Sequence, residues 1–242
     1  MKKQIPMSDI GYPAVAYVGH RYYNGSMTRE TPFAEGEYYH IYNRGTNKMN
    51  IFNSSADFER FITLLFLANS RETPQYSDMG EENIWNIDRG ETLVDIGAYC
   101  LMPNHFHILI KTKNDKSVSL FIQRLLTSHS KYFNKKYNRS GSLFQGKSKS
   151  KRATEDRYLK YLFAYIHLNP LKIIDSEWKE SGVRDLSKTL DYLKKYNYSS
   201  YNDYAGENRQ ESKILNKNSF PEYFTSPSEH INELKEWLIY EI

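Results

Sequence analysis

The sequence predicts an α+β protein in which helices pack on an antiparallel β-sheet. Two observations support this class. Segments with strand-like alternation and segments with helical spacing occur in the order strand, helix, strand, strand, helix, strand, helix, and only the turn-forming pair Pro103-Asn104 separates the second strand from the third. The chain has 242 residues, 39% hydrophobic and 26% charged, which is long enough for a buried core and typical of a soluble globular protein.

The first strand and the first helix come early in the chain. Residues 37–45, EYYHIYNRG, alternate and end in a glycine turn, which predicts a strand. Residues 54–70, SSADFERFITLLFLANS, begin with Ser and Asp residues that can cap a helix, and apolar residues from Phe58 to Phe66 recur at helical spacing. Residues 70–90 are polar and contain Pro and Gly, so we expect a long loop there.

The remaining elements follow the same logic. Residues 92–104 and 105–112 predict two adjacent strands. Residues 154–170 predict a helix with Thr154 as its N-cap, acidic residues in its first turn and Pro170 just past its end. We also expect an amphipathic helix over residues 117–137, a strand in the basic segment 147–153 and a last helix over residues 226–242.

Composition excludes several classes of protein. The single cysteine, Cys100, rules out a disulfide within the chain and a cysteine-based zinc site. The longest apolar run, residues 61–68, is too short to cross a bilayer. The N-terminal lysines precede no apolar stretch, so a secretory signal is not expected. We therefore expect a cytoplasmic protein with no membrane partner.

Charge is unevenly distributed along the chain. Residues 111–172 contain fifteen Lys and Arg against three acidic residues, a net charge of +12, whereas the remaining residues carry eighteen basic and twenty-six acidic side chains, a net charge of −8. A solvated basic face would explain this pattern. A phosphate-rich partner explains it better, because clustered Lys and Arg release condensed counterions when they meet a nucleic acid backbone.

Two histidines lie in the otherwise apolar segment LMPNHFHILI. Side chains alternate along a strand, so His105 and His107 point to the same face of the sheet. A lone histidine there would most often be a satisfied core residue, but a pair on one apolar face has a larger desolvation cost. A shared metal ion would remove that cost, although the spacing also arises by chance.

The segment YIHLNP offers further ligands on the predicted helix. Tyr165 and Asn169 are four residues apart and share one helix face, whereas His167 lies off that face and competes as the third metal ligand. Tyr165 also fits plain core packing together with Tyr158 and Tyr161. The residues alone leave these alternatives open.

One motif suggests nucleotide hydrolysis. Residues 141–148, GSLFQGKS, satisfy the P-loop pattern, but a P-loop follows a buried strand and opens a helix. The preceding KKYNRS and the following KSKSKRA fit neither element, so we reject this function.

Several motifs, taken together and in this order, resemble one known family. They are YHIYNRG, MPNHFHIL, LTSHSKYFNKKYNRSGSLFQG, YLKYLFAYIHLNP and YNYSSYNDYAG. The chain thereby resembles the single-tyrosine HUH transposases, and within them the REP-associated tyrosine transposases. The resemblance covers residues 37–206, roughly 70% of the chain. One departure is the sequence Lys147-Ser148-Lys149, where the family usually has Arg-Phe-Lys.

The resemblance implies a fold and a domain organisation. It predicts a ferredoxin/RRM-like HUH endonuclease core over residues 35–175, with an N-terminal extension over residues 1–34 and a C-terminal helical extension over residues 176–242. It also implies transposition, a form of DNA recombination, by an enzyme that acts on single-stranded DNA.

The resemblance implies a mechanism as well. His105, His107 and Asn169 would hold Mg²⁺ or Mn²⁺, and the Tyr165 hydroxyl would attack the scissile phosphate to give a 5′-phosphotyrosine intermediate. The nucleophile needs help, because a free tyrosine has a pKa of about 10. With one such tyrosine per chain, two cleavages need either a homodimer or two rounds of reaction.

The expected partner is single-stranded or hairpin DNA in the nucleoid. Tyr132, Phe133, Tyr137 and Phe144 could stack on bases, although Phe133 is more often expected in the core. The residues expected to contact phosphates are Lys131, Lys135, Lys136, Arg139, Lys147, Lys149, Lys151 and Arg152.

Two other functions stay open at this point. The chain could be a non-catalytic nucleic-acid-binding protein or regulator with a vestigial metal site. It could also hold zinc at His105, His107 and His167 and act as a hydrolase.

Overall fold

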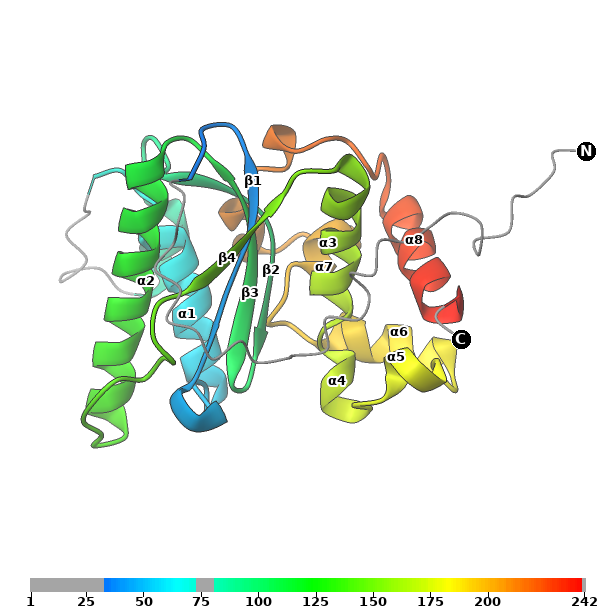
Figure 1. Ribbon diagram of the computed structural model, residues 1–242, viewed down its shortest axis with the longest axis horizontal. Coiled ribbons are helices and arrows are strands. Elements are labelled where there is room, and N and C mark those ends of the chain that lie inside the picture. Colours follow the sequence, from blue (N-terminus) through cyan, green and yellow to red (C-terminus); the bar gives the residue numbers. More distant parts are fainter. Residues whose placement is uncertain (1–32, 73–80, 241–242) are drawn as a thin grey trace, which may run out of the picture. The chain divides into compact units, whose positions relative to one another are not determined.

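The centre of the protein is a four-stranded sheet in the strand order β2-β3-β1-β4, with every neighbouring pair antiparallel (Figure 1). This computed structural model describes residues 33–72 and 81–240, so nearly all of the expected N-terminal extension lies outside the described residues. The predicted α+β class with an antiparallel sheet is confirmed. The strands are β1 (Tyr38–Arg44), β2 (Val94–Met102), β3 (His105–Thr112) and β4 (Lys149–Ala153).

The order of elements places β1 and β3 at the centre of the sheet. The chain runs β1, α1 (Ser55–Leu67), β2, β3, α2 (Asp115–Lys136) and β4, with β3 inserted between β1 and β2 and with β1 inserted between β3 and β4. This is the split β-α-β arrangement of ferredoxin-like folds. The strand that carries the paired histidines is therefore flanked by a strand on each side.

Helices α1 and α2 cover one face of the sheet (Figure 1). Ser54 and Asp57 form a capping box that fixes the start of α1. The Asn114 side chain accepts a hydrogen bond from the Ser117 amide and caps α2. Side chains of both helices enclose the main hydrophobic core with one face of β1, β2 and β3, including Ile41, Phe61, Leu65, Tyr99, Phe106, Ile108, Phe121 and Phe133.

Helix α3 (Asp156–Leu168) covers the opposite face and contacts β2, β3 and β4. Its predicted position is confirmed, but its N-cap is Glu155 rather than Thr154, because Thr154 belongs to the connection that leaves β4 at Ala153. Helix α8 (Pro227–Tyr240) packs against α3, and an ion pair of 2.7 Å joins Lys160 to Glu233. The predicted last helix is thus present.

Short helices fill the chain between α3 and α8. Three of these helices have only four residues and are too short to show helical periodicity in the sequence, and buried side chains such as Leu171 and Trp178 hold two of them in place. The helices are α4 (Leu171–Ile174), α5 (Trp178–Ser181), α6 (Leu186–Lys195) and α7 (Tyr201–Tyr204), and the 3₁₀ turns of the chain are η2 (Thr46–Lys48), η3 (Glu81–Asn86), η4 (Gln210–Ile214) and η5 (Lys217–Ser219).

Two further sequence expectations concern loops and membranes. Residues 141–148, which match the P-loop pattern, form a loop that leads into strand β4 and not into a helix. In residues 33–72 and 81–240, no helix combines the length and the apolarity that a bilayer crossing requires.

Candidate functional site

Strand register brings a set of polar side chains to the face of the sheet that α3 covers. His107 lies opposite Tyr42 on β1, and Tyr42 lies opposite Lys149 on β4. His40, one repeat further along β1, lies opposite Lys151. Because directly opposite residues share a face, all of these side chains project toward α3.

His105 and His107 lie together on this face, as strand alternation predicts. Their ring centroids are 5.0 Å apart. His105 is half-buried at the start of β3, whereas His107 is 2% exposed. Solvent can therefore reach His105, whereas His107 lies in the interior of the protein.

Tyr165 reaches this pair from α3. Its ring centroid lies 5.4 Å from that of His107 and 5.8 Å from that of His40, with edge-to-face geometry in both cases. Burial raises the pKa of Tyr165, and a hydrogen bond with the Asn169 side chain opposes that effect. The phenol is therefore protonated at neutral pH in the protein alone.

Asn169 ends α3 one turn after Tyr165. Its Nδ2 donates to the main-chain carbonyl oxygen of Tyr165 at 3.0 Å, which fixes the orientation of the amide. Its Oδ1 is buried and has no hydrogen-bond partner. A buried amide oxygen without a donor is costly, so this atom is suited to a ligand that the protein alone does not supply.

His40 is part of the site, although the sequence analysis gave it no role. Its Nε2 lies 2.8 Å from Nδ1 of His107, and the two rings are stacked with centroids 4.9 Å apart. Burial and then the charge of Lys151 lower the pKa of His40 to about 3, so its ring is neutral. The motif YHIYNRG contained the signal, but only the pairing of β1 with β3 reveals the partner.

Asn104 fixes the ring of His105. Nδ1 of His105 lies 2.6 Å from Oδ1 of Asn104, and Nδ2 of Asn104 donates to the carbonyl oxygen of Lys48 at 3.2 Å. The amide oxygen can only accept, so Nδ1 of His105 carries the proton and Nε2 keeps its lone pair. That tautomer is the one in which Nε2 can bind a metal.

The donor set of the site fits a divalent cation. The rings of His105 and His107 each have Nδ1 hydrogen-bonded to a neighbouring side chain, which leaves Nε2 of each ring as a nitrogen ligand. The buried Oδ1 of Asn169, which has no hydrogen-bond donor, is an oxygen ligand. Mn²⁺ and Mg²⁺ accept ligands of these kinds. No group of three or more His, Cys, Asp and Glu residues with metal-binding geometry occurs in the described part of the chain. If His105 and His107 bind a metal, a third ligand from the described residues would be of another type, such as the amide oxygen of Asn169.

His167 does not join this site, which removes the zinc hydrolase alternative. Its Nδ1 lies 2.9 Å from Nε2 of His230, and its Nε2 lies 2.8 Å from Oγ of Ser200. All three residues are fully buried on the side of α3 that packs against α8. His167 is thus a structural link between α3 and the C-terminal part of the chain.

Six of the eight basic residues expected to contact DNA fall into two groups. Lys149 and Lys151 on β4 are exposed and project from the same face as His40 and Tyr42. The other group lies on or just after α2, across the sheet from α3 (Figure 1), and consists of Lys131, Lys135, Lys136 and Arg139. Lys147 is exposed in the loop before β4.

Two of these basic side chains have acidic partners within the protein. Lys136 forms an ion pair of 2.6 Å with the fully buried carboxylate of Asp57. Arg152 pairs with Glu37 at 2.6 Å. Each partner reduces the charge that the basic residue can offer to a phosphate.

The aromatic residues near α2 form hydrogen bonds or core contacts within the protein. The hydroxyl groups of Tyr132 and Tyr137 donate to the two carboxylate oxygens of Asp57, at 3.0 and 2.7 Å. Phe133 and Phe144 are buried in the main core, as expected for Phe133. The expectation that Tyr132, Tyr137 and Phe144 stack on bases is therefore not supported.

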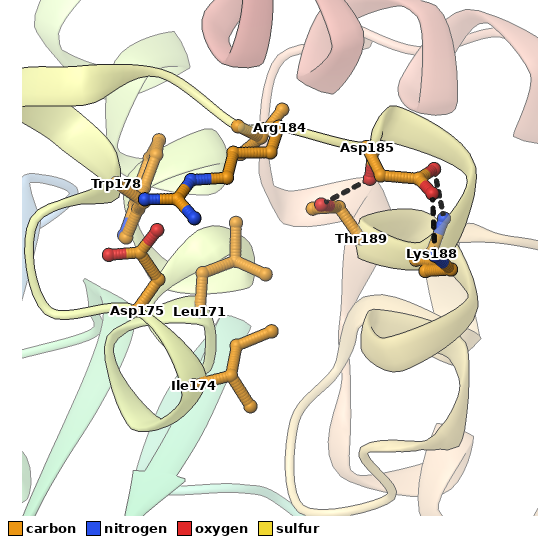
Figure 2. A pocket seen from close by; sticks show the side chains of 9 residues that line it. Leu171, Ile174, Asp175, Trp178, Arg184, Asp185, Lys188 and Thr189 are labelled. Carbon is orange, nitrogen blue, oxygen red and sulfur yellow. Dashed lines mark hydrogen bonds and ion pairs between the residues drawn. The ribbon is translucent and has the colours of Figure 1, made fainter.

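A separate hollow of about 170 Å³ lies between α4, α5 and α6 (Figure 2). Trp178 and Arg184 line one side, and Asp185, bonded to Lys188, lines the other. None of the predicted catalytic, metal-binding or DNA-binding residues lines it. The hollow is thus distinct from the site around Tyr165.

Comparisons with known proteins find similarity to one family model and to a solved structure. Residues 78–169 match the family model described as "Transposase IS200 like". One solved structure, described as the REP-associated tyrosine transposase bound to a REP hairpin, is 12% identical with a TM-score of 0.47, over 76% of this chain and 87% of that chain. No curated protein sequence matches. The matched region includes both paired histidines, Tyr165 and Asn169, and over these residues, which are less than half of the chain, the sequence is similar to IS200-like transposases.

Proposed function

We propose that the protein cleaves and rejoins single-stranded DNA through a 5′-phosphotyrosine intermediate on Tyr165, with a divalent metal bound by His105, His107 and Asn169. One observation carries the proposal. A strand and a helix that are distant in sequence bring a histidine pair, a tyrosine and an unpaired amide oxygen to one face of the sheet. The match of residues 78–169 to the family model of IS200-like transposases supports the same activity.

The mechanism begins with positioning. His107 and His40 contact the Tyr165 ring edge-to-face and restrict its orientation. The ring also packs against the hydrophobic cluster between α3 and the sheet. Oη of Tyr165 loses its proton and attacks phosphorus, the new Oη–P bond forms, the P–O3′ bond breaks, and the leaving O3′ takes up a proton to become a free 3′-hydroxyl. The covalent adduct keeps the energy of the broken bond, so a strand can be rejoined without ATP.

The tyrosine is not activated in the protein alone. Burial raises the pKa of Tyr165, so loss of the phenolic proton has to be coupled to substrate binding. A divalent ion held by His105, His107 and Asn169 would supply polarisation of a non-bridging phosphate oxygen. Asn104 and His40 would keep the two imidazoles in the orientation that this binding needs.

The substrate follows from access to the site. In-line attack requires a phosphate that is free of the duplex, so we propose single-stranded DNA, or a hairpin flanked by a single strand. Lys149 and Lys151 are exposed on the site face and would contact phosphates close to the cleavage position. Lys131 and Lys135 on α2 and Arg139 just after it would bind more distant parts of the strand, whereas Lys136 is paired with Asp57.

A second function is a non-catalytic DNA-binding protein that keeps the same basic surface. The two functions differ in one product. We would incubate the protein with end-labelled hairpin DNA and Mn²⁺, then look for a labelled protein band that survives denaturation. The enzyme forms that band, loses it on chelation with EDTA and loses it in Tyr165→Phe. Tight DNA binding without an adduct on any hairpin or single-stranded substrate would instead support the binding protein.

A further inference from the structure

Two lysines outside the predicted DNA contacts lie against the ring of Tyr165. Nζ of Lys172 is 5.5 Å from the ring centroid, and Nζ of Lys179 is 5.2 Å from it. Each lysine directly follows a buried anchor, Leu171 in α4 and Trp178 in α5, which are 1% and 3% exposed. The anchors hold both short helices, and therefore both ammonium groups, beside the tyrosine.

No ion pair within residues 33–72 and 81–240 neutralises the charge of this lysine pair. Among the residues that the structure describes, no carboxylate forms an ion pair with Lys172 or Lys179, whereas Lys160 on α3 pairs with Glu233. Both ammonium groups lie within 5.5 Å of the same ring centroid, so their like charges repel each other, and an anion between them would offset that repulsion.

The position of the pair indicates which anion it would bind. His40 and His107 contact the Tyr165 ring from β1 and β3, and the lysines contact the same ring from α4 and α5. Because each Nζ lies within 5.5 Å of the Tyr165 ring centroid, a phosphate bound at the Tyr165 hydroxyl would be within reach of both flexible lysine side chains. Lysine ammonium groups form charge-assisted hydrogen bonds with phosphate oxygens.

Resting on the function proposed above, we propose that Lys172 and Lys179 bind the DNA phosphate that Tyr165 attacks. The lysines hold this phosphate while the Oη–P bond forms and the P–O3′ bond breaks. They also hold the phosphotyrosine in place until a 3′-hydroxyl attacks it. The two lysines are thus binding residues for the reacting group.

A purely structural role for the same lysines makes a different prediction. In that case their aliphatic stems pack on the Tyr165 ring and the charge is incidental. Replacement by Met keeps most of the stem and removes the charge, whereas replacement by Arg keeps the charge. The pair Lys172→Met and Lys179→Met, compared with the two Arg replacements, therefore separates packing from phosphate binding.

The test measures DNA binding in a Tyr165→Phe background, so that no cleavage interferes. The affinity for a single-stranded oligonucleotide is determined at several salt concentrations. Each Met replacement should lower the affinity about tenfold at low salt and reduce the slope of log affinity against log salt by about 0.7, hence by about 1.4 for the double variant. The Arg variants should keep the wild-type slope. Lys195→Met, at the exposed end of α6, is the control with the same loss of charge and should change neither quantity.

An unchanged salt slope in the double Met variant would overturn the proposal. The identity of the phosphate is tested in EDTA, so that no metal ion contributes to binding, by placing a neutral methylphosphonate at the mapped cleavage position. This linkage should weaken binding of the parent protein and leave the double Met variant unaffected. An equal loss for both proteins would show that the lysines contact another phosphate. Because binding is measured without cleavage, failure to detect an adduct rejects the proposed enzyme without deciding the role of the lysines.

Discussion

His40 and His107 are joined by a hydrogen bond of 2.8 Å between Nε2 of the first and Nδ1 of the second. If His107 is to bind a metal through Nε2, its Nδ1 must carry the proton and donate it to His40. Burial, followed by the charge of Lys151, keeps the pKa of His40 low, so its Nε2 is able to accept. In the proposed metal site, His40 would therefore be a positioning residue that favours the tautomer of His107 able to bind a metal through Nε2.

His40→Ala should weaken metal binding more than catalysis. Loss of a residue that orients a metal ligand typically lowers metal affinity by roughly 10-fold to 100-fold. We expect the Mn²⁺ concentration for half-maximal adduct formation to rise by that factor, while the rate at saturating Mn²⁺ changes less. The measurement is a Mn²⁺ titration of adduct formation on a fixed hairpin substrate.

A control for this prediction is His230→Asn, which removes a buried histidine away from the site. It should lower stability and leave the Mn²⁺ midpoint unchanged. A His40→Ala protein with a normal Mn²⁺ midpoint would contradict the positioning role.

The sequence predicted the elements that carry the site because their signals are local. Alternation in HFHILI is enough to place His105 and His107 on one face, and capping and periodicity are enough to place Tyr165 on a helix. The role of His40 could not be predicted in this way. Its partner is 67 residues away, and only the register between β1 and β3 brings the two rings together.

Long-range pairing also explains what composition could not reveal about the basic residues. Lys136 belongs to the basic segment, yet its partner Asp57 lies 79 residues earlier on α1. Lys172 and Lys179 lie on four-residue helices that tertiary anchors hold, so no periodicity marks their proximity to Tyr165.

Lys136 should contribute to stability rather than to DNA binding. Burial alone would raise the pKa of Asp57, but hydrogen bonds from Lys136, the Asn53 amide, Tyr137 and Tyr132 hold it well below its usual range. Asp57→Ala removes the centre of this network and should cost about 3 kcal/mol of unfolding free energy. Lys136→Ala should lower the midpoint of urea unfolding and leave the salt dependence of DNA binding unchanged.

The matched comparison is Lys151→Ala on the site face. Lys151 lies opposite His40 and is exposed, so its loss should reduce the slope of log affinity against log salt by about 0.7. The reverse pattern, a reduced slope for Lys136→Ala and none for Lys151→Ala, would place the DNA on the α2 face.

Acid should destabilise the protein through His129. Burial lowers the pKa of His129 to about 4, while Nε2 donates to the carbonyl oxygen of Ile51. The unfolded chain binds a proton below about pH 6.5, and the native protein does not until about pH 4. This contribution to stability is complete above pH 6.5 and falls by up to about 3 kcal/mol between pH 6.5 and 4.

His129→Gln should flatten the dependence of stability on pH in this range by one proton. The measurement is urea unfolding at pH 7.5, 6, 5 and 4.5 for both proteins. Their difference in unfolding free energy should be constant above pH 7 and should shrink as the pH falls. Parallel curves over the whole range would contradict the assignment.

The most direct measurement identifies the residue that becomes joined to DNA. The protein is incubated with hairpin DNA and Mn²⁺, digested with nuclease and trypsin, and examined by tandem mass spectrometry. Residues 161–172 form one tryptic peptide with two tyrosines, so fragment ions have to distinguish Tyr165 from Tyr161. We predict a nucleotide joined to Tyr165 through its 5′-phosphate. This adduct should be retained in Tyr161→Phe and absent in Tyr165→Phe. A modification on Tyr161, or an adduct that persists in Tyr165→Phe, would contradict the account.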